Sequence, residues 1–148
     1  MDILVYDKLT TFCAYQERCV IDVRKKLQRL KIDSSEYAVY IDKLVSENFI
    51  NEDRYTKYFV SSHQKKKWGK TKIKAALTAK KIDATIIKAY LDDMNDDDYE
   101  SQLAEVATKK WTTIKAETTR ERKTKLLRFL LGRGYEMNRA LAAIKFLK

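Results

Sequence analysis

A six-position apolar pattern occurs three times along the chain and limits its possible folds more than any other feature of the sequence. Within each copy the apolar positions are spaced by four, five, five, four and three residues. The second copy lies 50 residues after the first, and the third lies a further 53 residues on. A repeat with this period is typical of a helical array in which each unit packs on its neighbours. The three copies are Val23, Leu27, Ile32, Tyr37, Ile41 and Leu44; Ile73, Leu77, Ile82, Ile87, Leu91 and Met94; and Leu126, Leu130, Tyr135, Ala140, Ile144 and Leu147.

Each copy of the pattern predicts two short amphipathic helices joined by a tight corner. Asp33 and Asp83 come just before the second helix, where a carboxylate can accept hydrogen bonds from unpaired backbone N–H groups. A third helix is expected over residues 53–67, and a counterpart that opens with the acidic run at 96–98 follows the second copy. The repeating unit is therefore three helices long.

The predicted fold class is all-α, with tandem three-helix repeats that form an elongated, curved array. We expect an N-terminal leader helix in residues 1–18, repeats in residues 19–68 and 69–118, and an incomplete last repeat in residues 119–148. The sequence has no proline and only three glycines, so sustained helix is permitted almost everywhere. An all-β fold is disfavoured for the same reason.

The N-terminal residues and the hydropathy of the chain indicate where the protein resides. No apolar run approaches the roughly 20 residues that span a bilayer, and the N-terminus lacks the cationic start and apolar core of a secretory signal. We therefore expect a cytoplasmic monomer that does not associate with membranes.

Few residues of this chain are suited to catalysis or metal binding. The two cysteines, Cys13 and Cys19, lie on different faces if they share a helix, which favours buried, reduced thiols over a local disulfide or metal clip. A catalytic pair with the single histidine, His63, stays open as an alternative, because such partners can be distant in sequence. An acidic cluster within 92–98 could hold a cation, but helix capping is favoured because the alternating ligands of a calcium loop are absent. We expect no enzyme activity and no cofactor.

The net charge of +10 is concentrated in the central and C-terminal parts of the chain. Residues 1–64 contain ten basic and ten acidic residues, whereas residues 65–91 contain nine basic and one acidic. Residues 92–105 contain seven acidic and no basic residues, and residues 106–148 contain twelve basic and three acidic. A surface kept soluble by charge usually mixes both signs, so the basic segments indicate a polyanionic partner.

A tryptophan stands beside a basic run at each of two repeat junctions. Trp68 follows Lys65-Lys66-Lys67, and Trp111 follows Lys109-Lys110. An aromatic face could stack on a nucleic-acid base, but packing between repeats is the favoured role for both tryptophans. No helix that reads bases is identifiable, so any nucleic-acid binding is expected to be independent of sequence.

One longer segment combines a helix cap, an internal arginine and a basic stretch with a glycine at a fixed spacing. It comprises Phe49-Ile50-Asn51-Glu52-Asp53-Arg54-Tyr55-Thr56-Lys57-Tyr58-Phe59-Val60 and Lys67-Trp68-Gly69-Lys70-Thr71-Lys72-Ile73. This segment resembles the signature of the bacterial RecX regulatory proteins, and the likeness extends over about residues 19–148. The resemblance implies tandem three-helix repeats and a protein that binds in the groove of the RecA–DNA filament, where it modulates the recombinase and ATPase activities of RecA.

The sequence departs from the RecX pattern at two predicted corners. Lys31 and Lys81 stand where the family commonly has glycine, and only Gly134 keeps it. A left-handed backbone at such a position costs a lysine about 1 kcal/mol, which is a reason to expect these corners to close differently.

The resemblance and the charge pattern together predict a non-catalytic regulator in DNA repair, recombination and the SOS response. It is expected to bind RecA filaments, to inhibit ATP hydrolysis and strand exchange, and to contact DNA nonspecifically through its basic face. Arg54 is a further candidate that could equally pair with Asp53 or Glu52. The alternative is an autonomous helical-repeat protein that binds nucleic acid without sequence preference and without RecA. The expected contact residues are Lys65, Lys66, Lys67, Lys70, Lys72, Lys109, Lys110, Arg120, Arg122 and Arg128.

Overall fold

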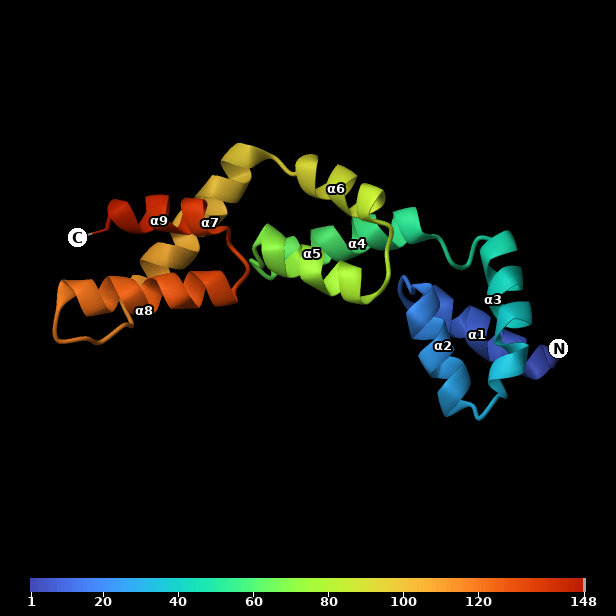
Figure 1. The fold of residues 1–148 in the computed structure, drawn as a ribbon. Helices are drawn as coiled ribbons and strands as arrows, with labels where there is room; N and C mark the ends of the chain where they lie inside the picture. Colours follow the sequence, from blue (N-terminus) through green and yellow to red (C-terminus); the bar gives the residue numbers. More distant parts are fainter. Residues whose placement is uncertain (148) are drawn as a thin grey trace.

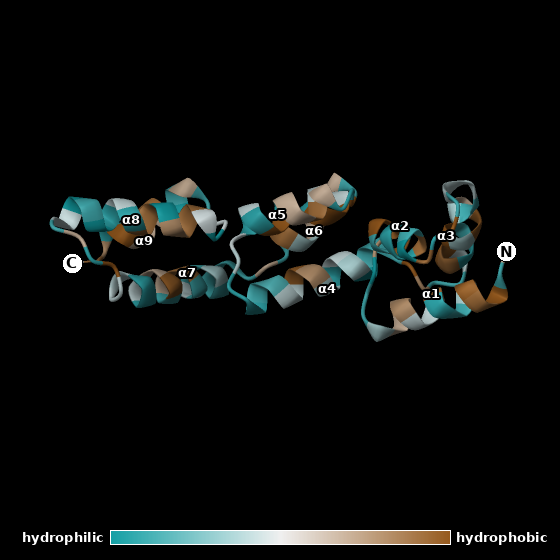
Figure 2. Cartoon of the chain, turned by 90° about the horizontal axis from the view of Figure 1, so that it is seen from below, coloured by the Kyte–Doolittle hydropathy of each residue, from teal (hydrophilic) through white to brown (hydrophobic). Residues whose placement is uncertain are grey.

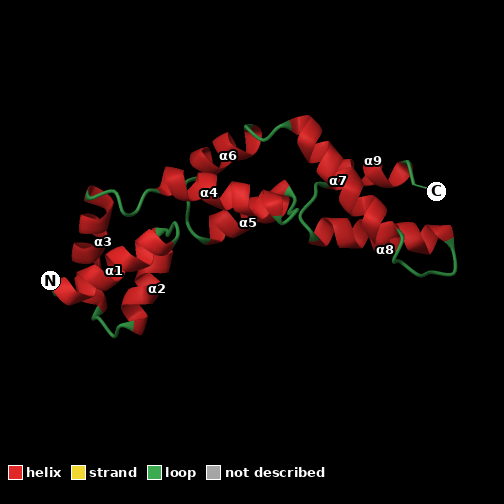
Figure 3. Ribbon diagram, turned by 180° about the vertical axis from the view of Figure 1, so that it is seen from behind, coloured by secondary structure: helices red, strands yellow, loops and turns green. Residues whose placement is uncertain are grey.

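The computed structural model describes residues 1–147, which form α-helices, one short 3-10 helix and connecting loops. No strand occurs among these residues, and Figure 3 shows helices joined by loops. The all-α fold predicted from the sequence is confirmed. The elements are α1 (Ile3–Tyr15), α2 (Val20–Arg29), η1 (Ser34–Glu36), α3 (Tyr37–Ser46), α4 (Glu52–Lys65), α5 (Lys70–Ala79), α6 (Ala84–Asp92), α7 (Asp96–Trp111), α8 (Thr119–Gly132) and α9 (Met137–Lys145).

Three hydrophobic clusters divide the helices into three units of three consecutive helices each. The first unit comprises α1, α2 and α3, the middle unit α4, α5 and α6, and the last unit α7, α8 and α9. Figure 1 shows these units following one another along an elongated, bent array, with the two termini at opposite ends. The molecule is therefore a linear helical-repeat array.

The boundaries expected from the sequence are one helix out of phase with these clusters. The segment 1–18, expected as a leader, contains the first helix of the first unit, because Tyr6, Leu9 and Cys13 of α1 are buried in its cluster. The repeats expected over 19–68, 69–118 and 119–148 each begin with the second helix of a unit, and α7 shares the cluster of the last unit with α8 and α9. Periodicity cannot set this phase, because a helix between two hairpins can cover either of them.

The repeated apolar pattern forms the centres of the three clusters. Ile32, Met94 and Leu147 are half-buried, and the remaining members of the pattern are all buried. Figure 2 shows apolar and polar residues alternating along the helices, as expected of helices that bury one face. The pattern therefore predicts the core correctly at the level of single residues.

The three corners within the hairpins close in the same way, contrary to the expectation for Lys31 and Lys81. Both lysines adopt the left-handed conformation, with φ of 59° and 58°, and Gly134 has φ of 95°. In the first corner the Lys31 N–H donates to the carbonyl of Gln28 and the Ile32 N–H to that of Leu27, and the other two corners repeat these bonds. The two hydrogen bonds of this helix C-cap outweigh the cost of about 1 kcal/mol for a left-handed lysine.

The first and middle units meet where the N-terminal turn of α2 packs against the end of α5, and we call this contact the first joint. Asp22 accepts from the Lys80 ammonium at 2.6 Å, and Arg54 of α4 pairs with Glu17. Burial alone would raise the pKa of Asp22, but the Lys80 ammonium and the Cys19 backbone N–H hold it below its ordinary value. The first joint thus contains two side-chain ion pairs.

The middle and last units meet in the equivalent way, where the start of α5 packs against the corner between α8 and α9. In this second joint the Gly69 N–H donates to the Arg133 carbonyl at 2.8 Å, and the Thr71 N–H donates to the Gly134 carbonyl at 2.9 Å. A Cβ atom on Gly69 would lie 2.2 Å from the Gly134 carbonyl carbon, and one on Gly134 would lie 2.2 Å from Cβ of Lys72. Two glycines therefore allow backbone to contact backbone at the second joint.

Candidate functional site

The basic run at the end of α4 is held in place by the second joint. Lys66 caps α4, and Lys67 takes a left-handed conformation with φ of 63°. The Arg133 guanidinium donates to the Lys66 carbonyl at 2.7 Å, and the Tyr135 hydroxyl donates to the Lys67 carbonyl at 2.8 Å. The side chains of Lys65 and Lys66 are exposed. The run therefore presents the exposed side chains of Lys65 and Lys66 on a backbone held by hydrogen bonds.

Lys70 and Lys72 lie at the start of α5, beside aromatic rings of the same joint. The Lys70 backbone N–H donates to the Tyr99 hydroxyl at 2.9 Å, and its ammonium lies 4.9 Å from the centre of the Tyr99 ring. Burial, reinforced by the hydrogen bond from this hydroxyl to Glu136, raises the pKa of Tyr99 far above its ordinary range. The Lys72 ammonium lies 4.1 Å from the centre of the Trp68 ring. Both lysines are half-buried and contribute to packing as well as to charge.

Lys109 and Lys110 lie at the end of α7 and share a groove of about 350 Å³ with Lys67. The structure also places Arg133 in this groove, although the sequence analysis did not single it out. The sequence held one signal for this residue, its position in the repeat. Arg133 lies 53 residues after Lys80, and each of the two is the C-cap of the first helix of its hairpin. Four basic residues from three separate segments of the chain thus line one groove.

The three predicted arginines of α8 differ in their surroundings. Arg122 is half-buried, its guanidinium stacks 3.8 Å from the centre of the Trp111 ring, and it donates to the Trp111 carbonyl at 2.6 Å. Arg120 and Arg128 are exposed and line a shallow groove along α8. Arg122 is therefore built into the last unit, whereas the other two project toward solvent.

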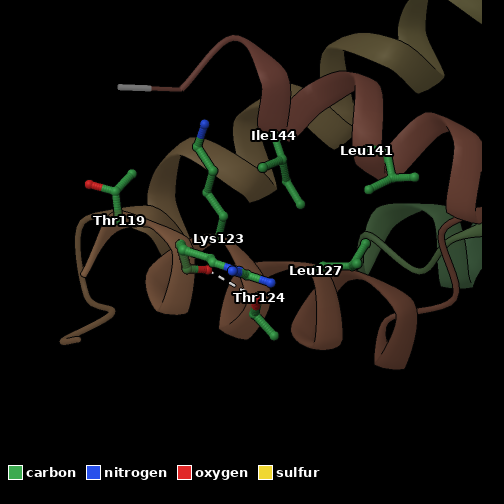
Figure 4. Close-up of a pocket in the computed structure, with 7 residues that line it drawn as sticks. Thr119, Lys123, Thr124, Leu127, Leu141 and Ile144 are labelled. Atoms are coloured by element: carbon green, nitrogen blue, oxygen red, sulfur yellow. Dashed lines mark hydrogen bonds between the residues drawn. The ribbon is translucent and has the colours of Figure 1, made fainter. Parts of the chain in front are cut away.

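A second groove lies between residues of α8 and α9 and carries apolar side chains. Figure 4 shows Leu127, Leu141 and Ile144 facing this groove, with Lys123 and Thr119 at its edge. Arg120 also lines it, so this predicted contact residue lies between an apolar groove and a basic helix face.

The tryptophans and the single histidine are packed within the protein. Trp111 is 7% exposed and belongs to the cluster of the last unit, while Trp68 is half-buried against the cluster of the middle unit. The His63 ring stacks on Phe59 with centroids 3.9 Å apart and also contacts Trp68. These contacts support the packing interpretation of both tryptophans.

The buried thiols are poorly suited to nucleophilic catalysis. Burial raises the pKa of Cys13 to about 11 and also raises that of Cys19. A thiol that stays protonated at neutral pH is a weak nucleophile, so this environment gives the Cys–His alternative no support.

Two acidic side chains near the start of α7 pair with an arginine of α9. Arg139 pairs with Asp96 at 2.7 Å, with Glu136 at 3.1 Å and with Glu100. Within residues 1–147 no group of three or more His, Cys, Asp or Glu side chains is arranged to hold a metal ion. No helix in the described part of the chain is long and apolar enough to cross a membrane.

Arg54 has partners other than those considered from the sequence. Its guanidinium pairs with Glu17 and donates to the carbonyls of Asn48 and Phe49 at 3.0 and 3.3 Å. Arg54 therefore ties α4 to the loops of the first unit.

Comparisons with known proteins agree with the helix grouping seen in the structure. The second three-helix domain of RecX matches residues 51–91, and the third three-helix domain of RecX matches residues 96–144. These segments coincide with the middle and last units.

Three curated relatives are each named regulatory protein RecX. The Acinetobacter baylyi protein is 31% identical over 120 residues, which cover 81% of this chain and 73% of the relative. The Clostridium beijerinckii and Clostridium acetobutylicum proteins are 32% and 34% identical, over 84% and 77% of this chain. The chain spans only 59% and 55% of the length of these two relatives.

Solved structures show the same fold. The crystal structure of RecX from Lactobacillus salivarius has a TM-score of 0.78 at 24% identity and covers 95% of this chain and 92% of that one. A crystal structure of another regulatory protein RecX has a TM-score of 0.84 at 20% identity and covers 95% of this chain and 69% of that one.

Proposed function

The chain belongs to the RecX family of regulatory proteins, and we propose that it binds RecA filaments on DNA and inhibits their ATPase and recombinase activities. The observation that carries this proposal is the second joint, which gathers basic residues of two units on a backbone fixed by hydrogen bonds. A filament of RecA on DNA is a periodic polyanion, and a basic surface on a fixed backbone can bridge its neighbouring subunits.

In the proposed mechanism the protein carries out no chemistry of its own. It lies in the filament groove as a monomer in the cytoplasm and holds adjacent RecA subunits in one geometry, which slows ATP hydrolysis and strand exchange. Its contacts with DNA are independent of base sequence. The proposed contact residues are those of the basic segments: Lys65, Lys66, Lys67, Lys70, Lys72, Lys109, Lys110, Arg120 and Arg128, with Arg122 acting through its support of α8.

The test measures RecA ATPase on single-stranded DNA with this protein added far below the RecA concentration. We expect strong inhibition, and we expect it to be lost in a triple variant with Lys65→Glu, Lys66→Glu and Lys109→Glu. These side chains are exposed, so their replacement leaves the joint intact. The matched control carries Lys8→Glu, Lys25→Glu and Arg29→Glu, which change the charge equally on exposed positions of the first unit.

Two outcomes contradict the proposal. Equal loss of inhibition in the control variant shows that only the net charge matters. Inhibition that appears only when the protein is abundant enough to coat the DNA favours the autonomous nucleic-acid-binding protein, because competition for bare DNA requires stoichiometric amounts.

A further inference from the structure

The groove at the second joint differs from the rest of the basic surface because its cations come from three helix ends and two units. Lys67 follows α4, Lys109 and Lys110 end α7, and Arg133 caps α8. The groove measures about 350 Å³ and also contains Phe129 and one acidic residue, Glu105. We propose that this groove binds a backbone phosphate of a nucleic-acid strand. The inference rests on the proposed function, in which the filament supplies that strand.

Two of the four cations of the groove are positioned before any ligand arrives. Arg133 is anchored by its donation to the carbonyls of Lys66 and Lys67, at 2.7 and 3.3 Å. The Lys110 ammonium lies 4.6 Å from the centre of the Phe129 ring, which restricts its range of positions. A ligand therefore meets two cations that need little further ordering, and this lowers the entropic cost of binding.

One ion pair in the groove competes with an incoming anion. The Lys67 ammonium lies 3.0 Å from the Glu105 carboxylate, and these side chains are 41% and 63% exposed. Such an exposed pair is weak and screened by salt. A phosphate can therefore take the place of Glu105 beside Lys67, and Glu105 sets the affinity by competing with it.

The equivalent position at the first joint is neutralised and cannot bind a phosphate in this way. The counterparts of Lys67 and Arg133, by the repeat spacing of 50 and 53 residues, are Glu17 and Lys80. Glu17 has the opposite charge to Lys67, and both Glu17 and Lys80 are already engaged in the ion pairs of the first joint. The cationic groove is thus a feature of the second joint and does not follow from the fold alone.

The lining of the groove favours the backbone of a strand over a nucleotide base. Phe129 is half-buried and the Lys110 ammonium already lies over its ring, so this ring does not offer a free face for stacking. The remaining groups are ammonium and guanidinium donors, which bind phosphate and carry no preference among bases. A phosphodiester therefore fits the groove better than a free nucleotide does.

The test measures the binding of a fluorescein-labelled single-stranded oligonucleotide by anisotropy, in the absence of RecA and over a range of salt concentrations. We expect Lys109→Gln to weaken binding and to lower the slope of log affinity against log salt by about 0.7, the value for one lost phosphate contact on a single strand. We expect Glu105→Gln to tighten binding about two- to fivefold by removing the competitor of the phosphate. Lys25→Gln is the matched control, because it removes one exposed lysine from the first unit.

Three results overturn this assignment. The first is equal weakening by Lys25→Gln and Lys109→Gln, which reports diffuse charge only. The second is unchanged or weaker binding in Glu105→Gln. The third is displacement of the oligonucleotide by ADP at equal phosphate concentration, together with tighter ADP binding in Glu105→Gln, which assigns the groove to a free nucleotide. Because RecA is absent, these results stand apart from the ATPase test, and either proposal can fail while the other holds.

Discussion

Replacing Gly69 by serine tests whether the second joint holds the middle and last units together. Gly69 has φ of −77° and ψ of 162°, an extended conformation that any residue adopts, and it is the N-cap of α5. Serine is among the preferred N-cap residues, so within the middle unit the substitution is expected to be neutral or stabilising. The cost arises only from the joint, where the new Cβ would lie 2.2 Å from the Gly134 carbonyl carbon.

The size of the effect follows from the contacts across this joint. The 2.2 Å distance is more than 1 Å below the 3.4 Å at which ordinary contact begins, and the opposing atoms are backbone. The two backbone segments must therefore move apart, which breaks the hydrogen bonds from the N–H groups of residues 69 and 71. At about 1 kcal/mol for each bond, the joint is expected to lose about 2 kcal/mol.

Amide hydrogen exchange of Thr71 measures this loss directly. We expect the Thr71 amide to exchange about 30-fold faster in Gly69→Ser, while the amide of Leu77 in the core of α5 keeps its protection. The control is Gly132→Ala, where a new Cβ meets nothing within 4 Å and the helix gains about 0.5 to 1 kcal/mol. Unchanged exchange at Thr71 together with a more stable protein would refute the reasoning, because the joint would then tolerate the side chain.

Three further substitutions separate structural charges from exposed ones. Asp22→Asn is expected to lower the free energy of unfolding by about 1 kcal/mol at pH 7, through loss of the Lys80 pair. Because the pKa of Asp22 is lowered by folding, its contribution is present above its ordinary value of 3.8 and is lost as the pH falls through the folded value. Urea unfolding at pH 7 and pH 3 should therefore show a smaller difference between the two proteins at pH 3, and a constant difference contradicts the ion pair. Arg122→Ala is expected to destabilise the last unit by about 1 to 2 kcal/mol through its contacts with Trp111, whereas Arg128→Ala should change stability by less than about 0.5 kcal/mol; equal effects of the two in urea unfolding contradict this distinction.

The sequence allowed the core to be predicted more fully than the joints. Positions such as Val23, Ile73 and Leu126 are recognisable because helical periodicity is a local signal that reports burial directly. The grouping of helices into units was less accessible, since the same periodicity results whichever helix begins the unit. The prediction that the corners at Lys31 and Lys81 close differently is wrong. The cost of a left-handed lysine is visible in the sequence, whereas the hydrogen bonds that compensate for it are not.

The candidate site was only partly predictable, because its residues meet through contacts that are distant in sequence. The basic run at 65–67 was evident from charge, but Arg133 donates to the carbonyl of a residue 67 positions earlier. The available signal was the placement of Gly69 and Gly134, two of the three glycines in the chain, at positions where the units meet. Glycines in an otherwise glycine-poor helical sequence can therefore mark close approaches of the backbone between units.

The two joints place different limits on how the array can respond to its surroundings. The first joint contains the Asp22–Lys80 and Glu17–Arg54 ion pairs, whose attraction salt screens in part, whereas the second contains backbone hydrogen bonds that salt affects little. Higher salt therefore weakens the ion pairs of the first joint and the phosphate contacts at the same time. A salt titration alone cannot distinguish a change in the shape of the array from a loss of attraction between protein and phosphate. Gly69→Ser alters the second joint without altering any charge. The loss of affinity for a polyanion in this variant therefore measures how far binding depends on the fixed geometry of the middle and last units.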